Sequence, residues 1–382
     1  MPEALDQQRL RDALALAETV FGLTDPNPRV GCVIGLGDGR VLGRGATQQQ
    51  GGPHAEVMAL RDAAAGGHSV RGATAWVTLE PCAHHGRTPP CCDALIAAGL
   101  ARVVVAVADP FPQVNGQGIA RLRAAGIRVD MAAGELAAAA HDINIGFFSR
   151  VQRGRPWVRM KVAASLDGTT ALHNGASQWI TSDAARRDGH AWRRRASALL
   201  TGIGTVLADD PRLDVRWVDS PFQPLRVVLD SQFRLPPTAR LLAPPGAVLV
   251  VGTRPPCAAS QALSESGAEV LHLPGINEAH GSIGHQAHSQ PVDLHALLPA
   301  LAARGVNELH LEAGARLNGA FLAAGLVDEV LLYLAPKLLG PGRPMAQWGP
   351  LHALSEQVAL DIQGCTPIGP DLRIRARVRS SF

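Results

Sequence analysis

Four residues in the first quarter of the chain have the types and the order of a catalytic zinc site. His54 and Glu56 are separated by one residue, and Cys82 and Cys91 follow. One imidazole and two thiolates are a standard ligand set for catalytic zinc, and they leave the fourth coordination position open for water. The sequence therefore predicts metal ligands at His54, Cys82 and Cys91, with Glu56 left free to move protons.

The same residues match the signature H-x-E…P-C-x-x-C of zinc-dependent nucleobase deaminases, in which the glutamate is not a ligand. The chain departs from it in one place, because eight residues rather than two separate Cys82 from Cys91. Alone, a His-x-Glu pair indicates only an ordinary helix start, but the two cysteines favour the metal site. A non-enzymatic protein with structural zinc is an alternative, which would require a fourth protein ligand.

The elements around these residues can bring them together. Apolar residues recur at helical spacing over 54–64, and residues 73–79 have the pattern of a buried strand that ends just before Cys82. Cys91 opens a second helical run over 92–98. Two helix starts and one strand end can converge on a single ion.

Charge and aromatic content exclude some partners. The net charge is +3 at pH 7, and aromatic residues form 4% of the chain. Proteins that bind nucleic acids concentrate basic residues on one face and stack bases on aromatic side chains. We therefore expect a small-molecule substrate and no nucleic acid, although a free-nucleoside deaminase with an unrelated second domain stays an alternative.

The cysteines and the apolar pattern indicate the compartment. Six cysteines in 382 residues, without a leader sequence, suggest metal binding and core packing rather than a disulfide framework. No apolar run reaches 18 residues, so no membrane segment is expected. We expect a cytoplasmic protein that forms a homo-oligomer.

The length and the alternation of strands and helices predict two domains. Helices between strands indicate crossovers over a mostly parallel sheet. We expect a three-layer α/β/α domain over residues 1–150 and a second α/β domain over 151–382, because the basic segment 150–156 ends in proline.

Some further residues have two interpretations. Asn27 between two prolines is either a turn former or an amide that reads a base edge, and the sequence does not decide. Cys32 is expected in the core. The glycines at 202, 204 and 314 could admit a phosphate, but no complete phosphate-binding motif is present. The polar segment 277–290 carries three histidines, which could bind a metal, but their irregular spacing favours a solvated loop.

Long motifs in both domains resemble the family of bifunctional riboflavin-biosynthesis deaminase/reductases. The eight-residue spacer between the two cysteines is this family's own form. The motifs lie at residues 26–28, 54–56, 78–95, 161–168, 177–181, 205–211 and 335–340.

This resemblance implies a cytidine-deaminase-like zinc domain followed by a dihydrofolate-reductase-like domain. The first would bind one Zn²⁺ ion and hydrolyse the 2-amino group of 2,5-diamino-6-(5-phosphoribosylamino)pyrimidin-4-one. The second would use NADPH to reduce the opened ribose to a ribityl chain.

The resemblance also implies contacts in the second domain. The positions that match the family's NADPH contacts are Ala163, Trp179, Thr205, Asp209, Ser231, Gly314, Ala315, Arg316, Leu317, Asn318, Gly319 and Ala320. The positions that match its substrate contacts are Ser177, Arg193, Leu213, Arg216 and Glu312. Arginine suits a phosphorylated substrate because guanidinium binds phosphate bidentately. Thr169 stands where relatives often carry a basic residue, so we expect no phosphate contact there.

Overall fold

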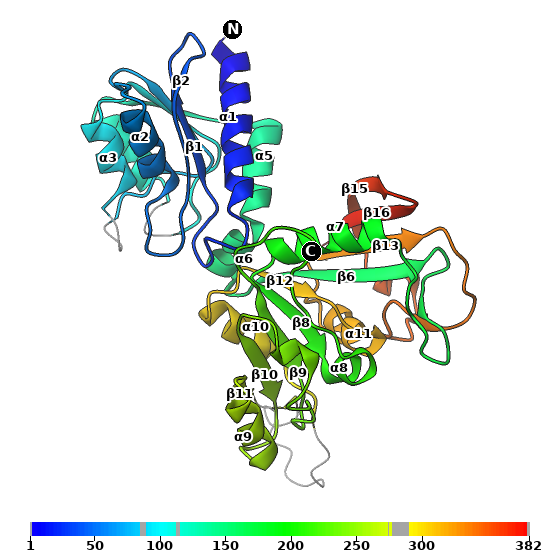
Figure 1. Ribbon diagram of the computed structural model, residues 1–382. Coiled ribbons are helices and arrows are strands. Elements are labelled where there is room, and N and C mark those ends of the chain that lie inside the picture. The colour runs from blue at the N-terminus through cyan, green and yellow to red at the C-terminus, as the bar shows by residue number, and fades with distance from the viewer. Residues whose placement is uncertain (1, 85–88, 112–114, 274, 277–289, 380–382) are drawn as a thin grey trace. The chain divides into compact units, whose positions relative to one another are not determined.

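The computed structural model describes residues 2–84, 89–111, 115–273, 275–276 and 290–379. The chain divides into two compact units, Met1–Gly154 and Arg155–Phe382 (Figure 1). The boundary expected after residue 150 falls inside α6 (Ile145–Arg153), just before this division. Apart from Gln290, the segment 277–290 lies outside the described residues.

The first unit contains a five-stranded sheet in the order β2-β1-β3-β4-β5. Strand β1 is antiparallel to its two neighbours, β2 and β3, whereas β3, β4 and β5 are parallel. The expected parallel arrangement is therefore confined to one side, because β1 and β2 form a hairpin with a short connection. The strands are β1 (Gly31–Gly35), β2 (Val41–Ala46), β3 (Thr74–Val77), β4 (Arg102–Val105) and β5 (Arg128–Met131).

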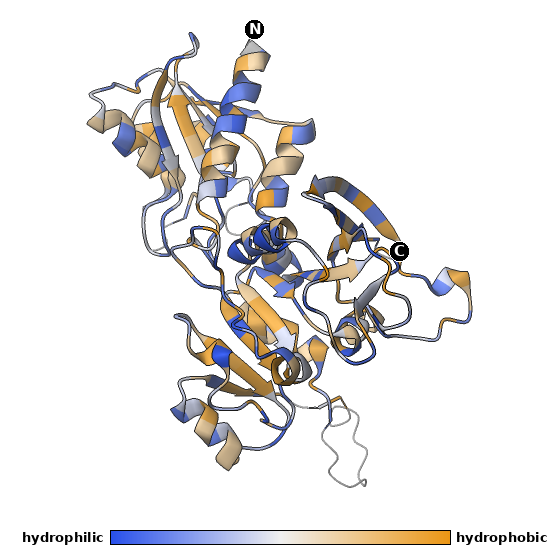
Figure 2. Cartoon of the chain, turned by 45° about the vertical axis from the view of Figure 1, so that its right-hand side comes forward, coloured by the Kyte–Doolittle hydropathy of each residue, from blue (hydrophilic) through white to orange (hydrophobic). Residues whose placement is uncertain are grey.

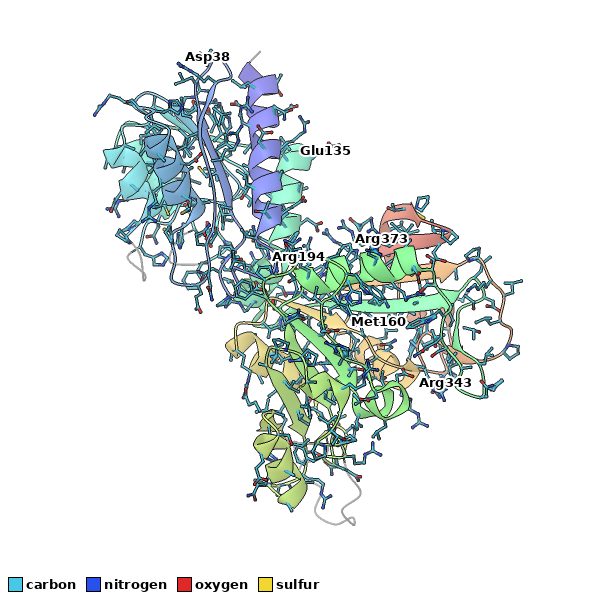
Figure 3. The ribbon with its side chains drawn as sticks, in the orientation of Figure 1. Asp38, Glu135, Met160, Arg194, Arg343 and Arg373 are labelled. Carbon is cyan, nitrogen blue, oxygen red and sulfur yellow. The ribbon has the colours of Figure 1, made fainter. Side chains whose placement is uncertain are left out.

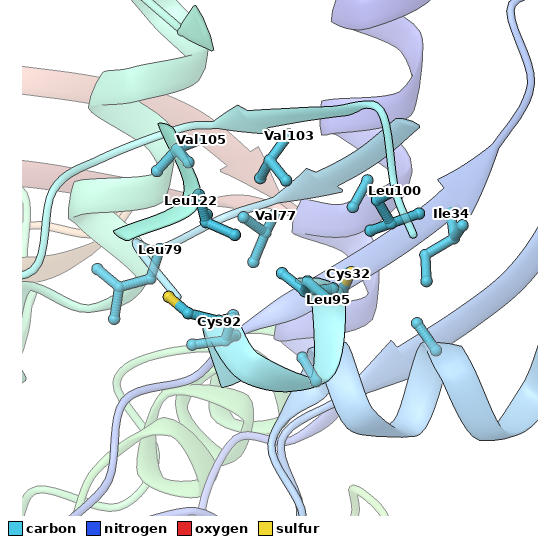
Figure 4. Packing of buried hydrophobic residues seen from close by; sticks show 14 of the residues in the cluster. Cys32, Ile34, Val77, Leu79, Cys92, Leu95, Leu100, Val103, Val105 and Leu122 are labelled. Atoms are coloured by element: carbon cyan, nitrogen blue, oxygen red, sulfur yellow. The ribbon is translucent and has the colours of Figure 1, made fainter. Parts of the chain in front are cut away.

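Helices cover both faces of this sheet, which confirms the three-layer architecture. Leu10 and Ile143, from α1 and α5, pack with Trp76 of β3 on one face. Leu95 and Leu122, from α3 and α4, pack on the other face, where Cys32 is also buried as expected (Figure 4). The helices are α1 (Pro2–Thr19), α2 (Ala55–Ala65), α3 (Cys91–Ala97), α4 (Gln117–Ala124) and α5 (Gly134–Ile143).

Helix α2, which begins at the predicted zinc site, lies unusually close to strand β2. A Cβ atom on Gly45 would stand 2.3 Å from the carbonyl oxygen of Ala55, and one on Gly43 would stand 2.2 Å from that of Ala59. The helix presents a face of buried alanines to these glycines. The absence of side chains on the strand therefore fixes the position of the helix.

The second unit contains a nine-stranded sheet in the order β11-β10-β9-β8-β12-β6-β13-β16-β15. The strands from β11 to β13 are parallel, and β16 and β15 add antiparallel strands at one edge. The parallel strands are β6 (Trp157–Ser165), β8 (Ala198–Gly202), β9 (Leu225–Leu229), β10 (Val248–Gly252), β11 (Glu269–His272), β12 (Glu308–Leu311) and β13 (Glu329–Ala335). The edge strands are β15 (Leu360–Ile368) and β16 (Asp371–Val378).

Apolar residues are concentrated on the central strands of this sheet, while β15 and β16 alternate in hydropathy (Figure 2). Met160 on β6, between β12 and β13, belongs to the main core cluster (Figure 3). A small antiparallel pair joins β7 (Thr169–Ala171) to β14 (Arg343–Pro344). The helices are α7 (Asp183–Arg195), α8 (Ile203–Asp209), α9 (Ala258–Glu265), α10 (Leu294–Ala303) and α11 (Ala315–Ala323).

No helix among the described residues is long and apolar enough to cross a membrane.

Candidate zinc centre and reductase site

The three predicted metal ligands meet in the first unit. Their ligand atoms lie within 4.8 Å of one another, and no other such group of His, Cys, Asp and Glu occurs in the described part of the chain. His54 is the N-cap of α2, and Cys91 is the first residue of α3. Cys82 lies in the segment that follows the end of β3 at Val77. The structure thus brings together two helix starts and a strand end, as the sequence predicts.

The distances between the ligand atoms fit a tetrahedral zinc ion. Nδ1 of His54 lies 3.6 Å from Sγ of Cys82 and 3.3 Å from Sγ of Cys91. Tetrahedral coordination at ordinary Zn–N and Zn–S bond lengths requires about 3.6 Å between a nitrogen and a sulfur ligand. The donor set and its spacing are therefore those of zinc.

Local electrostatics favour the thiolate that a metal requires. The hydrogen bond from Cys91, together with the interaction with His54, lowers the pKa of Cys82 to about 4. The backbone N–H of Cys91 also donates to Sγ of Cys82 over 3.3 Å. Cys82 is consequently ionised at neutral pH, in the form that binds metals.

Glu56 is the second residue of α2 and is 3% exposed. Burial, reinforced by the negative charge of Cys82, raises its pKa to about 7. A carboxyl group with a pKa near neutrality can both accept and release a proton. Its position beside the ligands and its pKa suit general acid–base catalysis.

A cavity of about 310 Å³ opens onto these residues. Asn27 lines it, so the position that the sequence left undecided faces the site. Asp109, which sequence reasoning did not single out, also lines it, and burial raises the pKa of this carboxyl to about 6. The remaining lining residues include Pro26, Thr47, Gln50, His84, Phe111, Phe147 and Arg150.

Glu80 also lines the cavity, but its carboxylate accepts hydrogen bonds from the backbone. It accepts backbone N–H groups from Gly116, Gly118 and Ile119 at 3.0, 2.9 and 3.2 Å, and from Asp109 at 3.3 Å. These bonds tie the segment before Cys82 to the start of α4. Glu80 is thus a structural carboxylate, in contrast to Glu56.

Cys92 is adjacent to a ligand but points elsewhere. Its thiol donates to the carbonyl oxygens of Pro81 and Gly118, at 3.2 and 3.5 Å. Burial raises its pKa to about 12, so it stays protonated. Cys92 therefore packs the interior instead of binding the metal.

The second unit holds a buried charge cluster after strand β12. Nε and Nη2 of Arg193 donate to the Glu312 carboxylate at 2.5 and 2.9 Å, and Nη1 donates to the carbonyl oxygen of Asp214 at 2.9 Å. Burial alone would raise the pKa of Glu312, but the charges of Arg193 and Lys161 hold it well below its usual range. Burial lowers the pKa of Lys161, which opens the motif at 161–168 but for which the sequence predicted no role.

Arg216 and Leu213 lie on the segment that this cluster holds. Nη1 of Arg216 donates to Oδ1 of Asp214 at 2.6 Å, and its side chain is 39% exposed. Arg193 is only 14% exposed and already uses three of its five N–H groups. Arg216 is therefore the arginine that is more accessible to a ligand.

The predicted cofactor positions follow the carboxyl ends of parallel strands. Thr205 lies on α8 after β8, Ser231 follows β9, and Gly314 is the N-cap of α11 after β12. A Cβ on Gly314 would lie 3.8 Å from Oγ1 of Thr205, so the starts of α8 and α11 are neighbours. This edge is where open α/β sheets bind nucleotides.

Helix α11 fits an anionic cofactor. Gly314 provides no side-chain cap, which leaves first-turn N–H groups for an anion. Residues 315–320 form most of the helix, and Asn318 and Gly319 are buried in it. Gly319 is required there, because a Cβ would stand 1.8 Å from the carbonyl oxygen of Gln347.

The other predicted positions are more dispersed. Ala163 lies on β6 and Asp209 ends α8. Trp179 is 61% exposed, with the guanidinium of Arg186 over its ring. Ser177 lies on the same loop. The hydroxyl of Thr169, where no phosphate contact was expected, donates to the carbonyl oxygen of Gly340 at 2.7 Å. Its hydrogen is therefore already used within the protein.

Comparisons with known proteins cover both units. The family model for the RibD C-terminal domain matches residues 156–374, and that for the cytidine and deoxycytidylate deaminase zinc-binding region matches residues 4–107. The riboflavin biosynthesis protein RibD of Escherichia coli is 44% identical over 380 residues, covering 96% of this chain and 98% of that protein. Its counterpart in Aquifex aeolicus is 38% identical over 374 residues, with coverage of 98% and 99%.

Solved structures agree with this result. RibD from Acinetobacter baumannii is 39% identical, with a TM-score of 0.85 and 99% of each chain covered. A Thermotoga maritima protein, described as a diaminohydroxyphosphoribosylaminopyrimidine deaminase and 5-amino-6-(5-phosphoribosylamino)uracil reductase, is 30% identical, with a TM-score of 0.84 and coverage of 98% and 99%.

Proposed function

The chain belongs to the RibD family of bifunctional riboflavin-biosynthesis deaminase/reductases, and on this basis we propose which residues serve each of its two activities. The enzyme uses zinc to remove the 2-amino group of 2,5-diamino-6-(5-phosphoribosylamino)pyrimidin-4-one. It then uses NADPH to reduce the ribosyl side chain, giving 5-amino-6-(5-phosphoribitylamino)uracil. We assign the deamination to the first unit and the reduction to the second.

His54, Cys82 and Cys91 would hold the zinc ion in the first unit. When bound, zinc supplies a Lewis acid that lowers the pKa of a water molecule in its open position. Glu56 would accept a proton from the water molecule that attacks the amino-bearing carbon, and would then deliver that proton to the departing ammonia. The cavity wall around Asn27 and Asp109 binds the pyrimidine and excludes bulk water.

In the second unit, NADPH supplies the hydride and the protein supplies position and charge. The start of α11, from Gly314 to Ala320, receives the cofactor's phosphates, with Thr205 and Ser231 beside it. Arg216 binds the substrate phosphate. Arg193 holds Glu312 ionised and in place beside the substrate. Further cofactor contacts are proposed at Ala163, Trp179 and Asp209, and further substrate contacts at Ser177 and Leu213.

The observation that carries the deaminase assignment is the convergence of His54, Cys82 and Cys91 beside the buried Glu56. The substrate is a phosphorylated small molecule. A homo-oligomeric state and a cytoplasmic location stay predictions.

The substitution Glu56→Gln tests the assignment, because it preserves size and removes the base. We expect stoichiometric zinc and a loss of deamination by about 10² to 10⁴-fold, the usual contribution of general acid–base catalysis. Metal analysis and ammonia release measure the two effects. The same variant, given deaminated substrate, should consume NADPH at the normal rate.

Loss of zinc from Glu56→Gln would instead make Glu56 a structural residue. A parallel loss of NADPH consumption would show that the two activities depend on each other.

A further inference from the structure

The segment 213–217, which carries Arg216, has a strained backbone. Leu213 and Trp217, near its two ends, have φ angles of 46° and 67°. Residues other than glycine rarely adopt this left-handed region, which costs on the order of 1 kcal/mol or more per residue. Such a conformation persists only where surrounding groups hold it.

Side chains from outside the segment supply that constraint. Nδ1 of His190 accepts the backbone N–H of Arg216 at 3.1 Å. The amide of Gln223 bonds to both the N–H and the carbonyl oxygen of Val215, at 2.7 and 3.0 Å. Arg193 donates to the carbonyl oxygen of Asp214. Three consecutive residues are thus fixed through their backbone atoms.

His190 has a second contact with the same segment. Its ring lies 4.8 Å from that of Trp217 in an edge-on arrangement, and the Arg216 guanidinium lies 5.0 Å from the centre of the Trp217 ring. His190 is 4% exposed. The imidazole therefore supports the Arg216 backbone directly and its side chain through the indole.

The protonation state of His190 is settled by this geometry. Because Nδ1 accepts an N–H, the ring proton must reside on Nε2. Burial, with the charges of Arg193 and Arg216 nearby, lowers the pKa of His190 to about 3. The neutral ring does not exchange protons with a substrate at neutral pH, so its role is geometric.

We propose that His190 is a positioning residue of the reductase, which directs Arg216 toward the substrate phosphate by accepting the Arg216 backbone N–H. His190 and Arg193 are three residues apart on α7 and so face the same side of the helix. One helix face thereby fixes both the Arg216 backbone and the Glu312 carboxylate. The inference rests on the proposed role of Arg216 as the phosphate ligand.

A pair of substitutions separates the hydrogen bond from simple packing. His190→Leu keeps the bulk and removes the acceptor, whereas His190→Asn keeps an acceptor close to the position of Nδ1. With deaminated substrate and NADPH, His190→Leu should raise the KM for the pyrimidine about 3- to 10-fold, the effect of one hydrogen bond. His190→Asn should recover most of this loss, and the KM for NADPH should not change in either variant.

NADPH binding reports whether each variant is folded. If His190→Leu loses it, His190→Ala provides the variant without an acceptor. A His190→Asn enzyme that is as impaired as His190→Leu would overturn the inference, since packing alone would then explain the loss.

A double-mutant cycle with Arg216→Ala tests the route of the effect. Arg216→Ala should raise the pyrimidine KM, and adding His190→Leu should change it little further. Full additivity of the two losses would overturn the inference while leaving the role of Arg216 intact. An unchanged KM in Arg216→Ala alone would refute the proposed function of Arg216, and the inference with it.

Discussion

Cys91 and Cys92 are adjacent, but their side chains point in different directions, so that we assign one to metal binding and the other to packing. Sγ of Cys91 faces His54, whereas the thiol of Cys92 donates to Pro81 and Gly118. We expect Cys91→Ala to lose zinc and Cys92→Ala to retain it. Metal content after dialysis measures both, and the opposite pattern would refute the ligand assignment.

The buried pair of Arg193 and Glu312 leads to a prediction about stability. Removing Arg193 leaves the Glu312 carboxylate buried without its main partner, which typically costs about 3 to 5 kcal/mol. We expect Arg193→Ala to lower the free energy of unfolding of the second unit by this order, as measured in urea. Glu312→Gln introduced into the same variant should restore part of the loss, and no restoration would argue against an unpaired charge as the cause.

The same pair predicts a pH dependence with a definite sign. The pKa of Glu312 is depressed in the folded state, whereas an unfolded glutamate titrates near about 4.3. The stabilisation is therefore complete above that pH and is lost as the pH falls through the folded-state pKa. The difference in unfolding free energy between the parent and Arg193→Ala should shrink in acid. A constant difference down to acidic pH would contradict this linkage.

The residues that sequence alone could identify are those whose chemistry is local. His54, Glu56, Cys82 and Cys91 could be predicted because metal binding restricts residue type and order. Glu80 could not, since its role depends on N–H groups that lie 29 to 39 positions further along the chain. His190 could not either, because its partner at Arg216 is 26 residues away.

At the scale of elements, the contact between α2 and β2 determines where the zinc ligands meet. Gly45→Ala would place a methyl group 2.3 Å from the Ala55 carbonyl oxygen, so the helix must move. Because α2 begins at His54 and carries Glu56, we expect weaker zinc retention and slower deamination, with reductase activity unchanged. Gly37→Ala, at a position open to solvent, is the matched control, and equal effects of the two would contradict this explanation.

The predicted elements differ from the observed ones at the exposed edge of the second sheet and in the pairing direction within the first sheet. Strand β10 is a continuous buried apolar run, the pattern that marks a strand of a parallel sheet, whereas β6 and β12 also bury Arg159, Glu308 and His310. The hairpin of β15 and β16 was not predicted: its residues alternate in hydropathy, but β15 is largely exposed and lacks the buried apolar face by which a strand is recognised. The mixed first sheet was missed because pairing direction depends on the order of strands in space and not on residue type.

At the scale of the whole chain, two compact units with different ligands predict separable unfolding. A ligand that binds only the native state stabilises its own unit, by about 2.7 kcal/mol at a hundred times its Kd. We expect a chelator to lower the unfolding temperature of one calorimetric transition and NADPH to raise that of the other. Equal shifts of a single transition would show that the units unfold together.

The strand order of the second sheet also has a consequence for protein synthesis. Strand β6 is the first strand of this sheet to be made, yet its partners in β12 and β13 come 151 and 170 residues later, a delay of roughly 8 to 34 s at about 5–20 residues per second. All strands of the first sheet, β1 to β5, belong to the first unit, so this sheet can form before the second unit is made. On the ribosome, the deaminase unit can therefore fold and acquire zinc before β12 and β13 are made. During this interval the apolar residues of β6 are exposed and accessible to chaperones.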